Sequence, residues 1–192
     1  RKDPDLSERL SIITRNTERM SNLVSDMLTL AKMEVAQSEP KLVRLNLKDI
    51  LSRQSEEFAQ RFEASEKTLS LQLSDAPAIM GDAESLNHLF SNLIENALKY
   101  SDTGASVKVI LKVRDGKSCV VVEDTGLGIP KEAIPRLFDR FYRVDKKAAR
   151  AKGGTGLGLS IVKTIADMHH AAIEVTSTEG KGTTFIVTFP VA

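Results

Sequence analysis

A long segment without glycine, from Asp5 to about Gln37, constrains the fold of this chain more than any other feature. Its apolar residues recur at alternating steps of three and four, which is the period of one face of an α-helix. Asp3 and Pro4 before it are typical of an N-cap followed by a proline in the first turn. The residues that hold the register are Leu6, Leu10, Ile13, Met20, Val24 and Met27, with Thr17 as a polar break, Ala31 as an extension, and Leu23 and Leu30 on a neighbouring row.

Such a helix is about 45 Å long at 1.5 Å per residue, which is too long for one small domain to cover. We therefore expect its apolar stripe to pack against another helix, in a bundle or a dimer. Packing against the chain's own domain is the alternative. The segment Ser38-Glu39-Pro40-Lys41 breaks the helix. It predicts a boundary between one unit over residues 1–37 and a second over residues 42–192.

Beyond this boundary the pattern changes to helices mixed with strands. Helices are predicted over residues 46–63, 82–99 and 156–168, and strands over 69–73, 107–113, 119–123, 173–177 and 184–189. The dipeptide Asp115-Gly116 indicates a tight hairpin turn between two of the strands. The predicted fold class is α+β, a two-layer sandwich with helices packed on one face of a mixed sheet and the long helix in front.

Composition excludes several classes of protein. The 27 basic and 26 acidic side chains nearly balance, so we expect no nucleic-acid partner. The single cysteine, Cys119, cannot form an internal disulfide, fits a reducing compartment and is expected to be buried in the apolar run 119–122. No apolar stretch approaches the roughly 18 residues of a membrane span, and no signal-peptide pattern appears. We expect a cytoplasmic segment without membrane contact; because the chain begins at Arg1, a longer, membrane-anchored parent stays open.

Four short blocks carry the chemistry, and the first is NLIENALKY at residues 92–100 on a predicted helix. Asn92 and Asn96 are four residues apart and project from the same face, with Lys99 one turn further on. Amide oxygens suit Mg²⁺ and an ammonium suits phosphate, so this face fits a metal–phosphate assembly. Taken alone, a polar helix surface is the alternative.

The second block is DTGLGIP at residues 124–130, directly after an apolar strand. Asp124 at the strand end can accept a hydrogen bond from an exocyclic amine, and the glycines let the backbone approach a flat ring. A plain turn explains the same residues.

The third block is LFDRFYR at residues 137–143. Its arginines can reach phosphate, and we expect Phe138 and Phe141 to anchor it to the core. A partly buried aromatic helix with solvated arginines is the alternative.

The fourth block is GGTGLGLS at residues 153–160, which opens the last predicted helix. Backbone N–H groups at such a glycine-rich start form a phosphate cradle. Because the block follows a loop and contains no Gly-Lys-Ser/Thr, a dinucleotide-binding fold is poorly supported and a P-loop is excluded. The basic, alanine-rich run 146–152 before it indicates either a lid over the ligand or a solvated loop.

In this order and at these distances, the blocks resemble the N, G1, F and G2 boxes of the catalytic domain of sensor histidine kinases. That family belongs to the superfamily of gyrase, Hsp90 and MutL ATPases, which share the Bergerat-type ATP-binding fold. The likeness covers residues 42–190. The leading helix, with NTERM at 16–20 and LVSDML at 23–28, resembles the second helix of the family's dimerisation and phosphotransfer hairpin. FYRVD at 141–145 resembles the large membrane-bound sensors of Gram-positive bacteria, including the cell-wall-regulating type.

The resemblance implies that the chain binds ATP and Mg²⁺. Asn96 would coordinate the metal, Asn92 would line the phosphate end, and Lys99 would flank the nucleotide. Arg143, together with Arg140, would contact the γ-phosphate. The implied catalytic residues are therefore Asn92, Lys99 and Arg143.

The resemblance also assigns the adenine end and the phosphate loop. Asp124 would bind the adenine amino group, with Thr184 nearby through a water molecule. The remaining residues implied at the nucleotide are Tyr100, Gly126, Gly128, Ile129, Gly154, Thr155, Gly156, Leu157, Gly158 and Leu159.

The family's phospho-accepting histidine lies on the first hairpin helix, in a His-Glu-Leu-Arg-Thr-Pro-like box that this chain lacks. We expect His88 to pack on its helix, and His169 and His170 stand where relatives read His-Gly-Gly, so the backbone there is expected to turn differently. The resemblance thus implies an ATP-donating part. Its partners would be a phosphoacceptor hairpin and a response-regulator receiver domain, and its parent protein would be a homodimer.

Three other functions compete with this one. Gyrase- or MutL-type hydrolases place a glutamate base four residues before the metal-binding asparagine, where this chain has Asn92, and an amide cannot accept a proton at neutral pH. Glu95 is rotated about 100° from Asn96 around the helix, so we expect it to face solvent. A serine/threonine anti-sigma kinase does not account for the long helix or the FYR block. A non-catalytic dimerisation module would not need four intact blocks.

Overall fold

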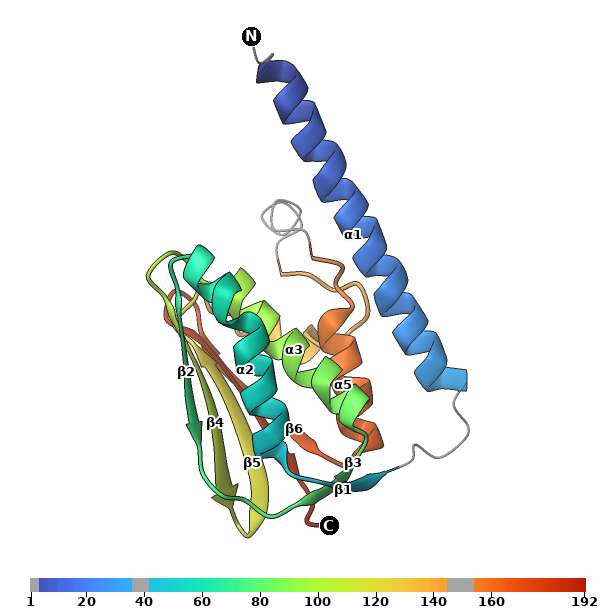
Figure 1. Ribbon diagram of the computed structural model, residues 1–192, viewed down its shortest axis with the longest axis vertical. Coiled ribbons are helices and arrows are strands. Elements are labelled where there is room, and N and C mark those ends of the chain that lie inside the picture. The colour runs from blue at the N-terminus through green and yellow to red at the C-terminus, as the bar shows by residue number, and fades with distance from the viewer. Residues whose placement is uncertain (1–3, 36–41, 145–153) are drawn as a thin grey trace.

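The computed structural model describes residues 4–35, 42–144 and 154–192 (Figure 1). The first helix, α1, runs over Pro4–Val35, which confirms the predicted long helix. Asp3, the boundary segment 38–41, the basic run 146–152 and Gly153 lie outside the described residues. No helix in the described part of the chain is long and apolar enough to cross a membrane.

The two apolar rows of α1 have different environments. On the main stripe Leu10, Met20 and Val24 remain exposed. On the neighbouring row Leu30 is buried and Leu23 packs against the core of the following domain. Figure 1 shows the second half of α1 beside α5 (Gly158–Met168). The row of Leu23 and Leu30 therefore packs on the chain's own domain, while the main stripe remains accessible to a second helix.

The rest of the chain is a two-layer α+β domain, as predicted. Three helices lie on one side of a five-stranded sheet (Figure 1). The strand order is β2-β4-β5-β7-β6, with β2 parallel to β4 and every other pair antiparallel. The elements are α2 (Leu47–Ala64), β2 (Thr68–Leu73), α3 (Ala83–Lys99), β4 (Ser106–Arg114), β5 (Lys117–Asp124), the 3-10 helix η1 (Ile134–Arg136), α5, β6 (Ala172–Thr178) and β7 (Gly182–Phe189).

Local signals account for where several of these elements begin and end. Asn46 caps α2 by accepting the N–H of Lys48, and Asp82 caps α3 by accepting the N–H of Ser85 at 2.8 Å. Asp115 and Gly116 both have positive φ, as a two-residue hairpin turn of type I′ requires. One pair of strands was not predicted: β1 (Val43–Leu45) pairs with β3 (Ile79–Gly81), and three residues are too few to show a period.

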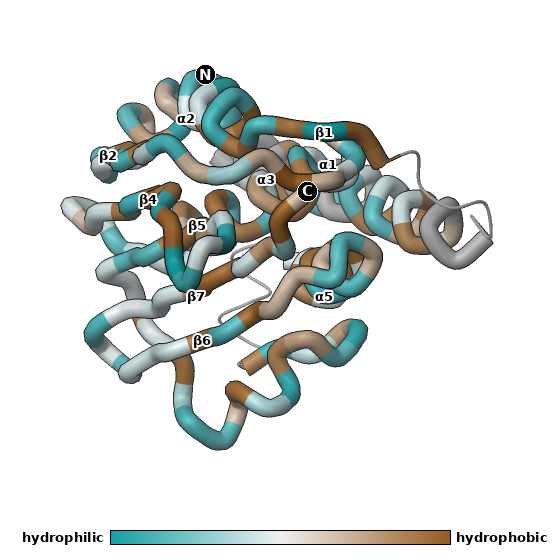
Figure 2. Tube along the Cα trace, turned by 90° about the horizontal axis from the view of Figure 1, so that it is seen from below, coloured by the Kyte–Doolittle hydropathy of each residue, from teal (hydrophilic) through white to brown (hydrophobic). Residues whose placement is uncertain are grey.

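The core lies between the helices and the sheet. Phe90, Leu93, Val107 and Phe189 are almost fully inaccessible there. Cys119 is also fully inaccessible, which confirms its predicted burial, but it is not part of this core cluster. In Figure 2 hydrophobic stretches (brown) recur along β1, β4 and β7, whereas hydrophilic stretches (teal) follow the turns at the margin of the sheet.

Two histidines close the end of α5. The His169 ring is buried; its Nε2 accepts the N–H of Asp82 at 3.0 Å, so its Nδ1 donates to the carbonyl of Ile165 at 2.7 Å. His170 adopts a left-handed conformation, with φ of 51°. It thereby takes the helix-ending backbone conformation that glycine adopts without strain. His169 thus joins α5 to the start of α3, and the N–H of His170 donates to the carbonyl of Asp167 at the end of α5.

Candidate nucleotide-binding site

The site is built where β5 ends. Asp124 is the last residue of that strand, and its Oδ1 accepts the backbone N–H of Gly126 at 2.8 Å and that of Thr183 at 3.3 Å. Burial raises the pKa of Asp124 above its ordinary value, and the two backbone hydrogen bonds partly offset this rise. The carboxylate is therefore held firmly by the ends of two strands, while desolvation makes it a stronger partner for a hydrogen-bond donor.

The turn after Asp124 needs its glycines. A Cβ on Gly126 would lie 2.5 Å from the carbonyl oxygen of Tyr100, and a Cβ on Gly128 would overlap the carbonyl of Thr178. Gly128 also has φ of +67°, which L side chains rarely adopt. The N–H of Ile129 then donates to Ser177 Oγ at 2.8 Å. The segment is thus packed closely against α3 on one side and β6 on the other.

Thr184 does not reach Asp124. In the antiparallel pairing of β5 with β7, Asp124 lies opposite Thr183, and Thr184 lies opposite Glu123 on the other face of the sheet. Thr183 is buried and its Oγ1 is 2.9 Å from Ser177 Oγ. Thr183 and Ser177 were both missed by sequence reasoning. The signal that could have found Thr183 is the register of β7 against β5, and these two strands are separated by a long stretch of the sequence.

Three polar side chains converge on Gly154 at the other end of the site. A Cβ placed on Gly154 would lie 3.2 Å from Tyr100 Oη, 3.4 Å from Lys99 Nζ and 3.6 Å from Arg143 Nη2. Burial lowers the pKa of Lys99, and the nearby Arg143 lowers it further, while Glu95 opposes the shift. The structure thus brings together residues of the first, third and fourth blocks, as the sequence predicts.

Arg143 provides the clearest sign of an anion-binding site. Its Nε and Nη2 are buried, and neither has a hydrogen-bond partner within the described residues. A guanidinium without partners for its buried nitrogens is costly, because the lost hydration is not replaced. An anion with several acceptor oxygens, such as a phosphate, would satisfy these donors. Arg140, which was predicted beside it, has an exposed side chain.

The third and fourth blocks are joined through the backbone. The N–H of Phe141 donates to the carbonyl of Gly156 at 2.8 Å, and Phe141 adopts a left-handed φ of 61° to make this bond. Phe141 is 58% exposed, so the prediction that it anchors the segment to the core is wrong; the prediction holds for Phe138, which packs against the core. Residues 137–143 also form turns after η1 instead of a helix.

The start of α5 approaches the first block closely. A Cβ on Gly158 would lie 2.5 Å from Asn92 Oδ1, and Asn92 Nδ2 donates to the carbonyl of His88 at 2.8 Å. Asn96 lies one turn further along the same helix and is half-buried. Of the predicted loop residues, Leu157 is buried in the core and Leu159 packs against it. Their side chains therefore serve packing, and only their backbone can face a ligand.

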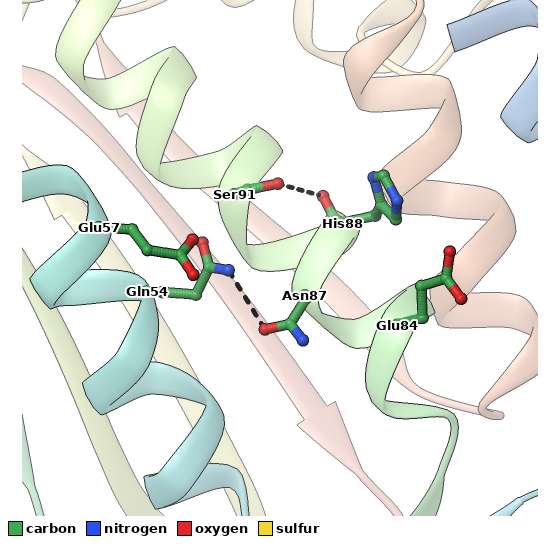
Figure 3. Close-up of a pocket in the computed structure, with 6 residues that line it drawn as sticks. All are labelled: Gln54, Glu57, Glu84, Asn87, His88 and Ser91. Atoms are coloured by element: carbon green, nitrogen blue, oxygen red, sulfur yellow. Dashed lines mark hydrogen bonds between the residues drawn. The ribbon is translucent and has the colours of Figure 1, made fainter. Parts of the chain in front are cut away.

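A separate polar groove lies between α2 and α3. It has a volume of about 400 Å³ and is lined by Gln54, Glu57, Glu84, Asn87, His88 and Ser91 (Figure 3). Gln54 Nε2 donates to Asn87 Oδ1 at 3.2 Å across the groove. The four convergent blocks line none of it, so this groove is distinct from the candidate site. Among the described residues, no cluster of three or more histidine, cysteine, aspartate or glutamate side chains could hold a metal ion.

Comparison with known proteins identifies the protein family to which this fold and site belong. The family described as histidine kinase-, DNA gyrase B-, and HSP90-like ATPase matches residues 81–192, which is more than half of the chain. The chain belongs to this family.

Among curated proteins, the chain is similar to sensor histidine kinases. It is 34% identical over 189 residues to the sensor histidine kinase RppB of Synechocystis sp., and 35% identical over 193 residues to the sensor histidine kinase WalK of Bacillus subtilis. These alignments cover 98% and 97% of this chain but 42% and 31% of the relatives. The chain therefore spans less than half the length of either.

Among solved structures, full-length ShkA in complex with AMPPNP matches all of this chain with a TM-score of 0.80, at 24% identity and over 40% of that protein's length. This likeness supports the fold. It includes the long first helix as well as the α+β domain, because the whole chain is covered.

Proposed function

We propose that residues 42–192 bind ATP with Mg²⁺ and donate the γ-phosphate to a histidine on a dimerisation hairpin, of which α1 is the second helix. The phosphoryl group then passes to an aspartate of a response-regulator receiver domain. The buried guanidinium of Arg143 carries the proposal, since its Nε and Nη2 await an anion beside Lys99 and the glycine loop.

Each end of the site suits one end of ATP. At Asp124 both backbone hydrogen bonds end on Oδ1, which leaves Oδ2 to accept the adenine amino group. Thr183, which lies opposite Asp124, would bind a water molecule beside it in place of Thr184. At the other end Lys99 and Arg143 would contact the phosphates, and the first N–H groups of α5, which have no side-chain cap, would bind the same anion.

The protein's part in the reaction is to position the nucleotide and to stabilise charge. The nitrogen of the acceptor imidazole forms a bond to the γ-phosphorus, and the bond from that phosphorus to the bridging oxygen of ADP breaks. Arg143 and Lys99 neutralise the oxygens of the transferring group. Mg²⁺, held by Asn96 together with phosphate oxygens, would supply further charge neutralisation.

Hydrolysis is disfavoured by the residues near Asn96. Asn92 stands where a hydrolase needs a carboxylate, and it is engaged with the carbonyl of His88 and with Gly158. Glu95 forms an ion pair with Arg61 at 3.3 Å, with its side chain 47% exposed. Glu95 is thus partly exposed on the surface of α3. A carboxylate held in that pair is not directed at a water molecule beside the phosphates.

The acceptor must come from outside this chain, because none of its histidines is suited to the role. His88 lines the separate polar groove between α2 and α3, His169 is buried with both ring nitrogens engaged, and His170 follows the end of α5 that is far from the glycine loop. We further propose a homodimeric parent with this segment in the cytoplasm and a membrane anchor elsewhere. The exposed stripe of α1, including Met20, Val24 and Met27, supports the dimer.

The test combines this chain with a separately made hairpin that carries a His-Glu-Leu-Arg-type box. With γ-labelled ATP and Mg²⁺, label should appear on the hairpin and disappear when its histidine is changed to glutamine. Titration calorimetry on the chain alone should show ATP–Mg²⁺ binding. Binding without any labelled histidine would overturn the kinase proposal, and rapid ATP hydrolysis abolished by Glu95→Ala would favour the hydrolase. Absence of binding would favour a non-catalytic module.

A further inference from the structure

One acidic residue of α1 reaches the nucleotide site. Leu23 and Leu30 pack against the ATP-binding domain, and Asp26 lies between them on the same face of the helix. Its Oδ2 accepts the hydroxyl of Thr155 at 2.7 Å, although the two residues are 129 positions apart. The same hydroxyl oxygen accepts the N–H of Leu157 at 3.2 Å. A carboxylate of the first helix is thereby joined to the loop that opens α5.

The surroundings of Asp26 are those of the phosphate end. Burial raises its pKa, which the Thr155 hydrogen bond partly offsets; Glu95 raises it further, whereas His88 and Lys99 lower it. The opposite charge of Asp26 in turn raises the pKa of Lys99 and so opposes the effect of burial. The negative charge of Asp26 therefore acts on the same ammonium group that faces Gly154 and Arg143.

We propose that Asp26 is a specificity-determining residue, which lowers the preference of the site for ATP over ADP while α1 is docked. The inference rests on the proposed function, since it assumes that the γ-phosphate lies beside Lys99 and Gly154. Two causes act together. A carboxylate beside the terminal phosphate repels it, and the single proton of the Thr155 hydroxyl is already donated to Asp26. ADP lacks the phosphate concerned and escapes most of this effect.

The coupling works in both directions. If docked Asp26 weakens binding of the γ-phosphate, then the γ-phosphate must weaken docking of α1 by the same factor. Occupation by ATP would loosen the contacts of Leu23 and Leu30, and ADP would leave them in place. The helix and the third phosphate thus compete for one corner of the site.

The test measures dissociation constants for a non-hydrolysable ATP analogue and for ADP, both with Mg²⁺, on the whole chain. Asp26→Asn removes the charge but keeps an oxygen that can accept the Thr155 hydroxyl. We expect it to shift the ATP-to-ADP affinity ratio toward ATP by about fivefold, the order expected for like charges roughly 8 Å apart in a partly hydrated site. Asp115→Asn, in the hairpin turn between β4 and β5, is the matched control and should leave the ratio unchanged.

A second measurement needs no variant. Amide hydrogen exchange over residues 23–31 of the unmodified chain should be faster with the ATP analogue than with ADP. An unchanged affinity ratio in Asp26→Asn, a ratio shifted toward ADP, or equal exchange with both nucleotides would overturn the inference while leaving the proposed function intact. Failure of the unmodified chain to bind either nucleotide would instead overturn the proposed function.

Discussion

The two ends of the proposed nucleotide site, the adenine end and the phosphate end, differ in how completely their polar groups are satisfied. At the adenine end the polar groups are paired with one another. Asp124 accepts the N–H groups of Gly126 and Thr183, and Ser177 bonds to the Thr183 hydroxyl and to the N–H of Ile129. At the phosphate end Arg143 keeps two buried nitrogens without a partner in the described part of the chain. The first end is preformed by the sheet, whereas the second needs an anion to complete it.

Their construction explains the difference. The adenine end rests on β5, β6 and β7, which are hydrogen-bonded neighbours in one sheet. The phosphate end collects side chains from α1, α3, the turns after η1 and the loop before α5, which share no such ladder. Changes at the adenine end should therefore affect ATP and ADP alike. Changes at the phosphate end should affect the γ-phosphate and the transfer step.

The largest effect is expected from Arg143→Ala. Loss of a guanidinium that stabilises charge on the transferring phosphoryl group should lower the rate of hairpin labelling by about 10³-fold or more, whereas ADP affinity should change little. The measurement is single-turnover labelling at saturating ATP together with ADP calorimetry. Arg114→Ala removes a surface arginine that pairs with Glu174 at the far end of the sheet and should change neither value. A rate loss below tenfold, or an equal loss of ADP affinity, would contradict the assignment.

A smaller effect, on nucleotide affinity instead of the transfer rate, is expected from Asp124→Asn. A hydrogen bond to a charged group contributes about 1.5–3 kcal/mol, so affinity should fall by roughly 10- to 140-fold. The loss should be the same for ATP and ADP, because both carry adenine. Glu123→Gln is the matched control, since its side chain lies on the other face of β5. If the ATP-to-ADP ratio moved with Asp124→Asn, the division of the site into two independent ends would be wrong.

Local signals predicted most of the fold. The caps Asn46 and Asp82, the turn at Asp115-Gly116 and the apolar periods of the helices all act within a few residues of one another. They fix element type and ends without knowledge of the rest of the chain. The β1–β3 pair was not predicted, because its two short strands are stabilised by pairing with each other and neither contains a recognisable sequence pattern.

The site was predicted less evenly, since parts of it depend on contacts between distant segments. The four blocks carry their own chemistry and were found. Thr183 depends on the register of β7 against β5, and the exposure of Phe141 depends on the left-handed turn that reaches Gly156. The hydrogen bond from Thr155 to Asp26 joins residues that are 129 positions apart. Hydrophobicity and spacing contain no signal for such contacts.

The smallest effect expected is on the pH dependence of ADP binding, which tests the adenine end alone. Burial raises the pKa of Asp124 above its ordinary value of 3.8, so protonation begins at a higher pH than for an exposed aspartate. The carboxylate is the better acceptor for the adenine amine, so ADP affinity should decline as pH falls through this raised pKa. Asp124→Asn should abolish that part of the pH profile.

The stability of the free protein should respond to the same group with the opposite sign. Because the folded pKa of Asp124 exceeds the unfolded one, the folded state binds more protons between the two values. The contribution of Asp124 to the free energy of unfolding therefore falls as pH rises through that window. Denaturant titrations at several pH values give the free energy of unfolding of the unmodified chain and of Asp124→Asn, both without nucleotide. Across the window this free energy should fall with rising pH more steeply for the unmodified chain than for Asp124→Asn. Equal slopes, together with an ADP profile that the substitution leaves unchanged, would mean that Asp124 titrates as an ordinary solvated carboxylate, and the adenine end would then be no more preformed than the phosphate end.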